Sequence, residues 1–137
     1  MDAEVVVAVD GPDDIVTARQ AGRVLASELG FSLTDVTMIA TAISEVARNI
    51  TSYAGSGEIR FLVEERSGGK ALVVEAADQG PGIEDVPRAL EDGFSTSSGL
   101  GVGLPGARRL MDQLEVHSRP GHGTLVLMWK WLPPDAG

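Results

Sequence analysis

The 137-residue chain contains no cysteine, which excludes disulfide bonds and thiolate metal sites. Basic residues are also scarce: 11 Lys and Arg stand against 20 Asp and Glu, giving a formal net charge of −9. This balance argues against duplex DNA or an anionic membrane as a partner, because both require a basic patch. The apolar run Val5–Val9 is too short for a signal peptide or a membrane span, and acidic residues flank it. We therefore expect a cytoplasmic protein.

Hydrophobic residues make up 43% of the chain, which is typical of a globular fold, and the length fits one domain. We expect a single domain over residues 1–137, with a frayed tail at 133–137. Hydrophobic periodicity predicts the secondary structure. The expected strands span 5–9, 58–66, 71–78, 114–119 and 124–132. The expected helices run from the turn at 11–14 to Leu29, from Ser32 or Thr34 to Tyr53, over 84–92 and over 104–113.

The order of these elements predicts the fold class. Most strands follow one another as hairpins, so their sheet should be largely antiparallel, and the helices must cover one of its faces. We therefore expect an α+β fold with a single-layer, mixed and largely antiparallel sheet. The last strand alternates, so that one of its faces carries Leu125, Leu127, Trp129 and Trp131. That face either packs under the helices as core or stays open as a surface for a partner.

Two acidic residues are candidates for chemistry. Glu45 and Asn49 are four residues apart on an expected helix, so their side chains are neighbours, although a solvated polar face is the simpler interpretation. Asp78 continues the more apolar face of its strand, where an unpaired carboxylate is costly. It either binds a ligand group or begins the following turn. His117 and His122 lack metal-ligand spacing, and we interpret both as surface residues.

The glycine-rich stretch GFSTSSGLGVGLPGARRL, at 93–110, opens an expected helix. It lacks the Gly-Lys-Ser/Thr of a Walker A loop, and no βαβ unit surrounds it as in a dinucleotide-binding fold. Backbone amides beside a helix N-terminus can bind phosphate, whereas a flexible linker is the competing interpretation. The length and polarity of the loop also suit a mobile lid.

Short patterns in the chain follow one another in a familiar order: ExxxN at 45–49, DxGxG at 78–82, GLGxGL at 99–104 and GT at 123–124. Together they resemble the boxes of the Bergerat-type (GHKL) ATPases, a superfamily that includes gyrase, heat-shock chaperones, mismatch-repair proteins and histidine kinases. The chain lacks the histidine-bearing dimerisation helices of a histidine kinase. From about Asp14 to Leu132 it is more similar to the small stand-alone serine/threonine kinases that control bacterial sigma factors.

Two longer stretches narrow the resemblance. ISEVARNITSYAG and EDGFSTSSGLGVGLPGARRLMDQ resemble the RsbT-like branch of these kinases, the stressosome switch kinases. The sigma-binding branch usually has Thr at the position of Arg48 and a His just after the ExxxN box, and this chain has neither. The resemblance therefore favours the RsbT-like branch.

The resemblance implies ATP and Mg²⁺ as ligands, and it implies a role for each box. Asn49 would help to hold Mg²⁺ against the phosphates, Glu45 would act as the general base, and Asp78 would accept a hydrogen bond from the adenine amino group, near Thr124. The other implied nucleotide-binding residues are Gly80, Gly82, Gly99, Leu100, Gly101, Val102, Gly103 and Leu104. The implied lid comprises Gly93, Phe94, Ser95, Thr96, Ser97 and Ser98.

The function implied by the resemblance is that of an ATP-dependent protein serine/threonine kinase. Its substrate would be a small STAS-domain protein of a stressosome-like complex in a sigma-factor stress-signalling pathway, with a PP2C-type phosphatase as the downstream target. One alternative is an anti-sigma factor kinase that binds sigma directly. The other is a nucleotide-dependent binding module that activates a PP2C-type phosphatase.

Overall fold

The structure is a computed structural model that describes residues 5–80, 103–118 and 120–133. The expected helix at 84–92 lies outside the described residues. In chain order the elements are β1 (Val5–Val9), α1 (Pro12–Leu29), α2 (Leu33–Asn49), η1 (Ile50–Ala54), β2 (Gly57–Arg66), β3 (Gly69–Asp78), α4 (Gly103–Leu110), β4 (Gln113–Ser118) and β5 (Thr124–Trp131).

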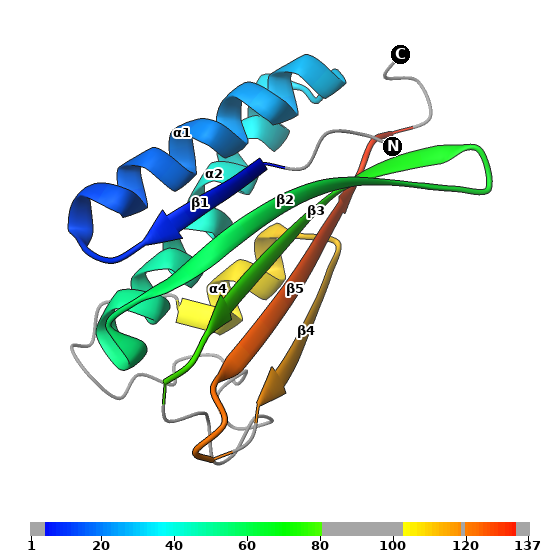
Figure 1. Cartoon of the computed structure of the whole chain (residues 1–137). Coiled ribbons are helices and arrows are strands. Elements are labelled where there is room, and N and C mark those ends of the chain that lie inside the picture. The colour runs from blue at the N-terminus through cyan, green and yellow to red at the C-terminus, as the bar shows by residue number, and fades with distance from the viewer. Residues whose placement is uncertain (1–4, 81–102, 119, 134–137) are drawn as a thin grey trace.

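The described strands form one five-stranded sheet in the order β1-β2-β3-β5-β4. Each neighbouring pair is antiparallel, which confirms the largely antiparallel sheet, but the expected mixed character is wrong because no parallel pair occurs among these strands. The three described α-helices lie on one side of the sheet (Figure 1) and cover one of its faces. The core between these layers confirms the α+β class; its largest fully buried side chains include Phe61, Ile39, Ile43, Ile59, Leu72 and Met128.

Capping residues mark the end of α1 and the start of α2. Gly30 adopts φ 102°, which favours glycine, and ends α1. The Ser32 hydroxyl accepts a hydrogen bond from the Asp35 amide at 3.1 Å and caps α2, which confirms the first of the two expected caps. The helical run extends to Ala54, close to the expected Tyr53, but its last turn is wider. There the Gly55 amide donates to the Ile50 carbonyl at 2.9 Å.

The helix after the glycine-rich stretch is shorter than its sequence predicts. Helix α4 ends at Leu110, and Gln113, expected to be helical, already belongs to β4. Asp112 explains the early end, because its amide donates to the Trp129 carbonyl at 2.9 Å and its carboxylate accepts from the Trp131 amide at 2.7 Å. These two bonds tie the chain to β5 before another helical turn can form.

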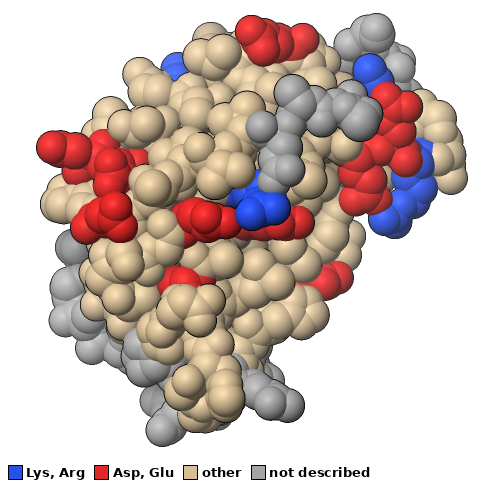
Figure 2. All heavy atoms as spheres, in the orientation of Figure 1, with Lys and Arg blue, Asp and Glu red and all other residues tan. Residues whose placement is uncertain are grey.

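The alternating faces of β5 have opposite environments. Val126, Met128 and Lys130 point toward the helices and are buried. The opposite face, which we call the open face of the sheet, carries the partly exposed Leu125, Leu127, Trp129 and Trp131. Figure 2 shows this side of the molecule, where charged side chains lie in separate groups within a mostly uncharged surface. The helices therefore do not cover the four large residues whose environment the sequence left open.

Two adjacent truncations test this assignment of faces. Met128 is fully buried, so Met128→Ala should lower the free energy of unfolding by about 2–5 kcal/mol. Leu127→Ala, on the open face, should lower it by about 1 kcal/mol, because that side chain already contacts water. Urea denaturation measures both. Equal losses, or a larger loss at Leu127, would contradict the assignment.

Candidate functional site

One end of the sheet carries three polar side chains in a row. The register pairs Asp78 of β3 with Thr124 of β5, and Thr124 with Ser118 of β4. Directly paired residues point to the same face of a sheet, here the face covered by the helices. We call these three residues the polar row. The next row inward is apolar and consists of Ala76, Val126 and Val116.

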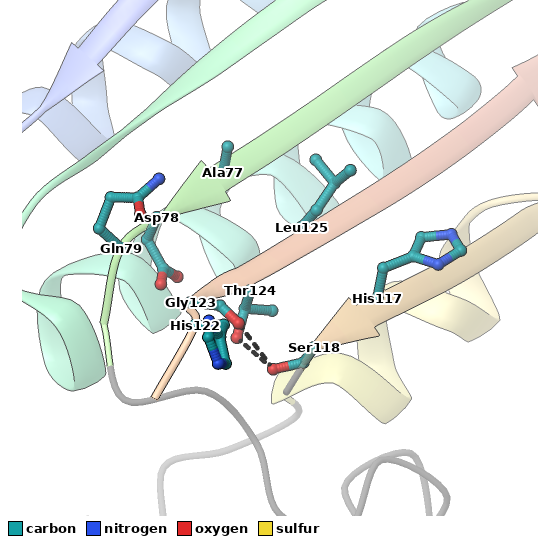
Figure 3. Close-up of a pocket in the computed structure, with 9 residues that line it drawn as sticks. All are labelled: Ala77, Asp78, Gln79, His117, Ser118, His122, Gly123, Thr124 and Leu125. Carbon is teal, nitrogen blue, oxygen red and sulfur yellow. Dashed lines mark hydrogen bonds between the residues drawn. The ribbon is translucent and has the colours of Figure 1, made fainter. Parts of the chain in front are cut away.

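Hydrogen bonds connect two members of the polar row, as the dashed lines in Figure 3 show. The Ser118 hydroxyl donates to the Gly123 carbonyl at 2.9 Å and lies 2.8 Å from the Thr124 hydroxyl. At the other end of the row, Oδ1 of Asp78 accepts a hydrogen bond from the Gly80 amide at 2.8 Å. Its Oδ2 receives no hydrogen bond from any described residue and is free to bind a ligand.

Glycines allow the backbone to close tightly around Asp78. A Cβ atom at Gly80 would lie 2.6 Å from the Cβ atom of Ala54 and 3.2 Å from Asp78 Oδ1. A Cβ atom at Gly123, where φ is 81°, would overlap the Asp78 carbonyl oxygen, and one at Gly57 would lie 3.1 Å from Asp78 Cβ. No larger residue therefore fits at these positions without shifting Ala54 or the backbone at Ala77 and Asp78. The sequence interpretation included Gly80 and Gly123 in its boxes but missed Gly57.

The polar row lines an open pocket of about 380 Å³ (Figure 3). The pocket continues around the end of the sheet, because its other lining residues are Ala77, Gln79, His117, His122, Gly123 and Leu125. Both histidines are exposed, as expected, and His117 Nε2 lies 3.2 Å from a Glu115 carboxylate oxygen. The pocket thus combines the carboxylate and hydroxyl groups of the polar row with the apolar side chains of Ala77 and Leu125, which reach it from the open face, and such a lining suits a ligand that has a flat apolar body and polar edges.

Glu45 does not lie on a solvated face of its helix. Its side chain is only 14% exposed, and both carboxylate oxygens have partners. Oε1 accepts a hydrogen bond from the Gly103 amide at 3.2 Å, and Oε2 accepts one from Arg48 at 3.1 Å. The first bond joins α2 to the first residue of α4, across a separation of 58 residues. The structure therefore places the ExxxN box against the last residues of the glycine-rich stretch.

Asn49 lies in the last turn of α2, one turn after Glu45, and is partly exposed. No described residue forms a hydrogen bond with its side chain, so the carboxamide oxygen is available as a ligand. Within the described part of the chain, no group of three or more His, Asp or Glu side chains could hold a metal ion. A magnesium ion accepts one amide oxygen when phosphates and waters complete its shell, so this donor set fits a cation carried by a phosphate ligand.

The structure tests the placement of part of the glycine-rich stretch. Gly103, with φ 51°, opens α4, and the side chain of Leu104 is buried in the core. Leu104 could therefore reach a ligand only through its backbone amide. The positions Gly82, Gly99, Leu100, Gly101 and Val102 lie outside the described residues, as does the expected lid at 93–98.

The three regions converge at one end of the molecule. Figure 1 shows the end of α2 and the start of α4 near the ends of β3 and β5, and α4 packs directly on α2. Hydrogen-bond acceptors lie on the sheet, while a carboxylate and a carboxamide lie on the helix that covers it. None of the helices described is long and apolar enough to cross a membrane.

A family model of the histidine kinase-like ATPase domain matches residues 9–130. The serine/threonine-protein kinase RsbT of Bacillus subtilis is 55% identical over 119 residues, which cover 87% of this chain and 90% of the relative. An anti-sigma F factor of a Thermoanaerobacter species is 32% identical over 122 residues, covering 86% of this chain and 85% of the relative.

A solved structure shares the fold. The crystal structure of the RsbU and RsbW domains of a Mycobacterium tuberculosis protein superposes with a TM-score of 0.64 at 17% identity, over 96% of this chain and 33% of that one. At this identity the likeness concerns the fold, whereas the family model and the relatives cover most of the sequence. The chain therefore belongs to the histidine kinase-like ATPase domain family, in its branch of RsbT-like serine/threonine protein kinases.

Proposed function

We propose that this chain transfers the γ-phosphate of ATP to a serine or threonine of a small STAS-domain protein in a sigma-factor stress-signalling pathway. The observation that carries the proposal is the convergence of the polar row with Glu45 and Asn49 at one end of the sheet. The 55% identity to a serine/threonine-protein kinase supports the type of reaction. We place the reaction in the cytoplasm, where sigma factors act.

The polar row is the proposed adenine site. An ionised carboxylate only accepts hydrogen bonds, so Asp78 selects an amino group rather than a carbonyl. Its Oδ1 is held by the Gly80 amide, which leaves Oδ2 for the adenine amino group. The apolar row of Ala76, Val126 and Val116 lies next to it, and its buried members Ala76 and Val126 would form an apolar floor beneath the base. This arrangement supports ATP rather than GTP as the nucleotide.

The phosphates are proposed to lie between α2 and the start of α4. The Asn49 carboxamide would ligate Mg²⁺, which, when bound, offsets the negative charge of the phosphates during transfer. The backbone amide of Leu104 is a candidate for a phosphate contact, in line with the preference of anions for helix N-termini, whereas the Gly103 amide already donates to Glu45. The roles of Gly82, Gly99, Leu100, Gly101 and Val102, and of the lid at 93–98, are proposed from the sequence pattern alone.

Glu45 is the proposed general base. A carboxylate has about four acceptor positions, and the Gly103 and Arg48 bonds occupy one on each oxygen. Glu45 therefore retains room for the hydroxyl of an incoming serine or threonine. It takes the hydroxyl proton while the hydroxyl oxygen bonds to the γ-phosphorus, and the bond from that phosphorus to the β–γ bridging oxygen breaks to release ADP.

The proposed STAS-domain and PP2C-type partners come from the family resemblance of the sequence, and the relatives support a partner-switching regulator in outline. In the leading proposal, the phosphorylated partner is a STAS-domain protein, and the released kinase activates a PP2C-type phosphatase. The 32% identity to anti-sigma F factors supports a second candidate, in which the chain binds a sigma factor directly. A pull-down of the purified sigma factors with the chain and ATP separates the two, since only the second candidate predicts a stable complex.

Phosphate transfer to purified STAS-domain proteins of the same organism tests the proposal. Each protein is mixed with the chain, Mg²⁺ and ATP, and its intact mass and phosphorylated residue are determined by mass spectrometry. We expect one added phosphate on a serine or threonine of one of these proteins, and none after that residue is changed to alanine. ATP binding and partner binding without any transfer would contradict the kinase and support a binding module.

A further inference from the structure

We propose that Ser118 is a specificity-determining residue that turns the Thr124 hydroxyl into a hydrogen-bond acceptor facing the nucleobase. The inference rests on the proposed binding of ATP at the polar row. Ser118 belongs to β4, the edge strand of the sheet, and it lies outside all of the sequence boxes. Only the pairing of β4 with β5 brings it beside Thr124.

The Ser118 hydroxyl has a single proton to donate. The Gly123 carbonyl, 2.9 Å away, can only accept, so Ser118 donates its proton there. Any group that bonds to the Ser118 oxygen must then donate to it. The Thr124 hydroxyl lies 2.8 Å from that oxygen and therefore points its own proton at Ser118. Away from Ser118, the Thr124 oxygen presents lone pairs only.

The polar row therefore presents only hydrogen-bond acceptors to the nucleobase. Asp78 presents a carboxylate oxygen and Thr124 a hydroxyl oxygen, both as acceptors, and these two residues are direct cross-strand partners. A purine with an amino group at position 6 offers a donor to this edge. The adenine amino group carries two N–H donors, one for each acceptor, whereas a purine with a carbonyl at the same position places an acceptor against acceptors, keeps only its N1–H as a donor on this edge and is disfavoured by the unmade hydrogen bonds. Without Ser118, the Thr124 hydroxyl would be free to donate, and this discrimination would weaken.

The backbone pairing of β4 with β5 does not depend on the Ser118 hydroxyl. Ser118 and Thr124 are paired by β4 and β5 regardless of their side chains, so removal of the Ser118 hydroxyl leaves the ladder intact. Ser118 is also partly exposed at the end of its strand, where a truncation to alanine creates no closed cavity. We therefore expect Ser118→Ala to fold and to change ligand preference rather than stability.

The test compares ATP with inosine triphosphate, which carries a carbonyl at position 6 in place of the amino group. Calorimetry with Mg²⁺ gives the ratio of the two dissociation constants. For Ser118→Ala, we expect the preference for ATP to shrink about three- to tenfold, the range of one hydrogen bond. Ser118→Thr keeps the hydroxyl on a residue that favours strands, and its ratio should stay within about twofold of wild type.

A double-mutant cycle separates this role from a general loss of packing. Thr124→Val removes the accepting oxygen and should reduce the preference for ATP over inosine triphosphate. Adding Ser118→Ala to Thr124→Val should reduce this preference no further. An unchanged ratio in either single variant, or fully additive effects, would overturn the inference. Wild-type protein that binds neither nucleotide would instead overturn the proposed function on which the inference rests.

Discussion

Glu45→Gln should reduce single-turnover phosphate transfer by about 10²–10⁴-fold while leaving ATP affinity nearly unchanged, because the amide cannot take a proton from the acceptor hydroxyl. Glutamine retains one oxygen that can accept the hydrogen bond from the Gly103 amide. The lost contact with Arg48, whose side chain is 43% exposed, should cost little stability. Rapid-quench transfer to a purified partner, with nucleotide binding measured in parallel, gives the two quantities.

A matched control removes the same charge from the same helix. Asp35→Asn, in the first turn of α2, lies far along the helix from Glu45 and should transfer phosphate at the wild-type rate. Transfer by Glu45→Gln at the wild-type rate would show that another group is the base. A large loss of ATP binding in Glu45→Gln would show that the carboxylate holds the nucleotide site together rather than acting in the chemical step.

Asp78→Asn should weaken ATP binding by about 1.5–3 kcal/mol, or roughly 10- to 150-fold in dissociation constant, the cost of losing a hydrogen bond to a charged group. The asparagine oxygen can still accept from the Gly80 amide, so the turn should remain. The new amide nitrogen then faces the adenine amino group, and two donors meet. Calorimetry with ATP measures the loss.

The control for this variant lies on the same strand. Glu75 points to the open face of the sheet, so Glu75→Gln makes the same change of charge away from the polar row and should bind ATP like wild type. Thermal denaturation confirms that both variants are folded. Wild-type ATP affinity in a folded Asp78→Asn variant would remove the polar row from the nucleotide site.

Elements with strong local signals were predicted well. The β-branched run Val5–Val9 forms β1 as expected, and Ser67 and Gly68, with φ of 52° and 81°, make the tight turn expected between β2 and β3. The alternation that put Asp78 on the face of Leu72, Val74 and Ala76 is also confirmed, because those three residues are buried under the helices. In each case the information lies within a few neighbouring residues.

What the sequence did not predict depends on contacts between distant residues. Alternation alone puts four large residues on one face of β5, but which face it is follows from the register of β5 with β3 and β4; the four are Leu125, Leu127, Trp129 and Trp131. The early end of α4 depends on bonds from Asp112 to β5. Helical periodicity continues through that point, so no local signal marks the end.

In the candidate site too, local spacing was predicted from the sequence, whereas contacts between distant residues were not. Spacing made Glu45 and Asn49 neighbours, but Glu45 is mostly buried where α4 packs on α2, and its partner Gly103 lies 58 residues away in the sequence. Ser118 and Gly57 carry no motif at all. Their positions beside Thr124 and Asp78 follow from strand register, which a single sequence does not specify.

A crystal structure of the protein with Mg²⁺ and a non-hydrolysable ATP analogue tests the central claim most directly, namely that one end of the sheet holds ATP between the polar row and α2. We predict that the adenine amino group lies within hydrogen-bonding distance of Asp78, that the Asn49 carboxamide ligates the magnesium ion, and that the γ-phosphate lies beside Glu45. A nucleotide bound on the open face, or one whose base lies away from Asp78 and Thr124, would contradict the claim.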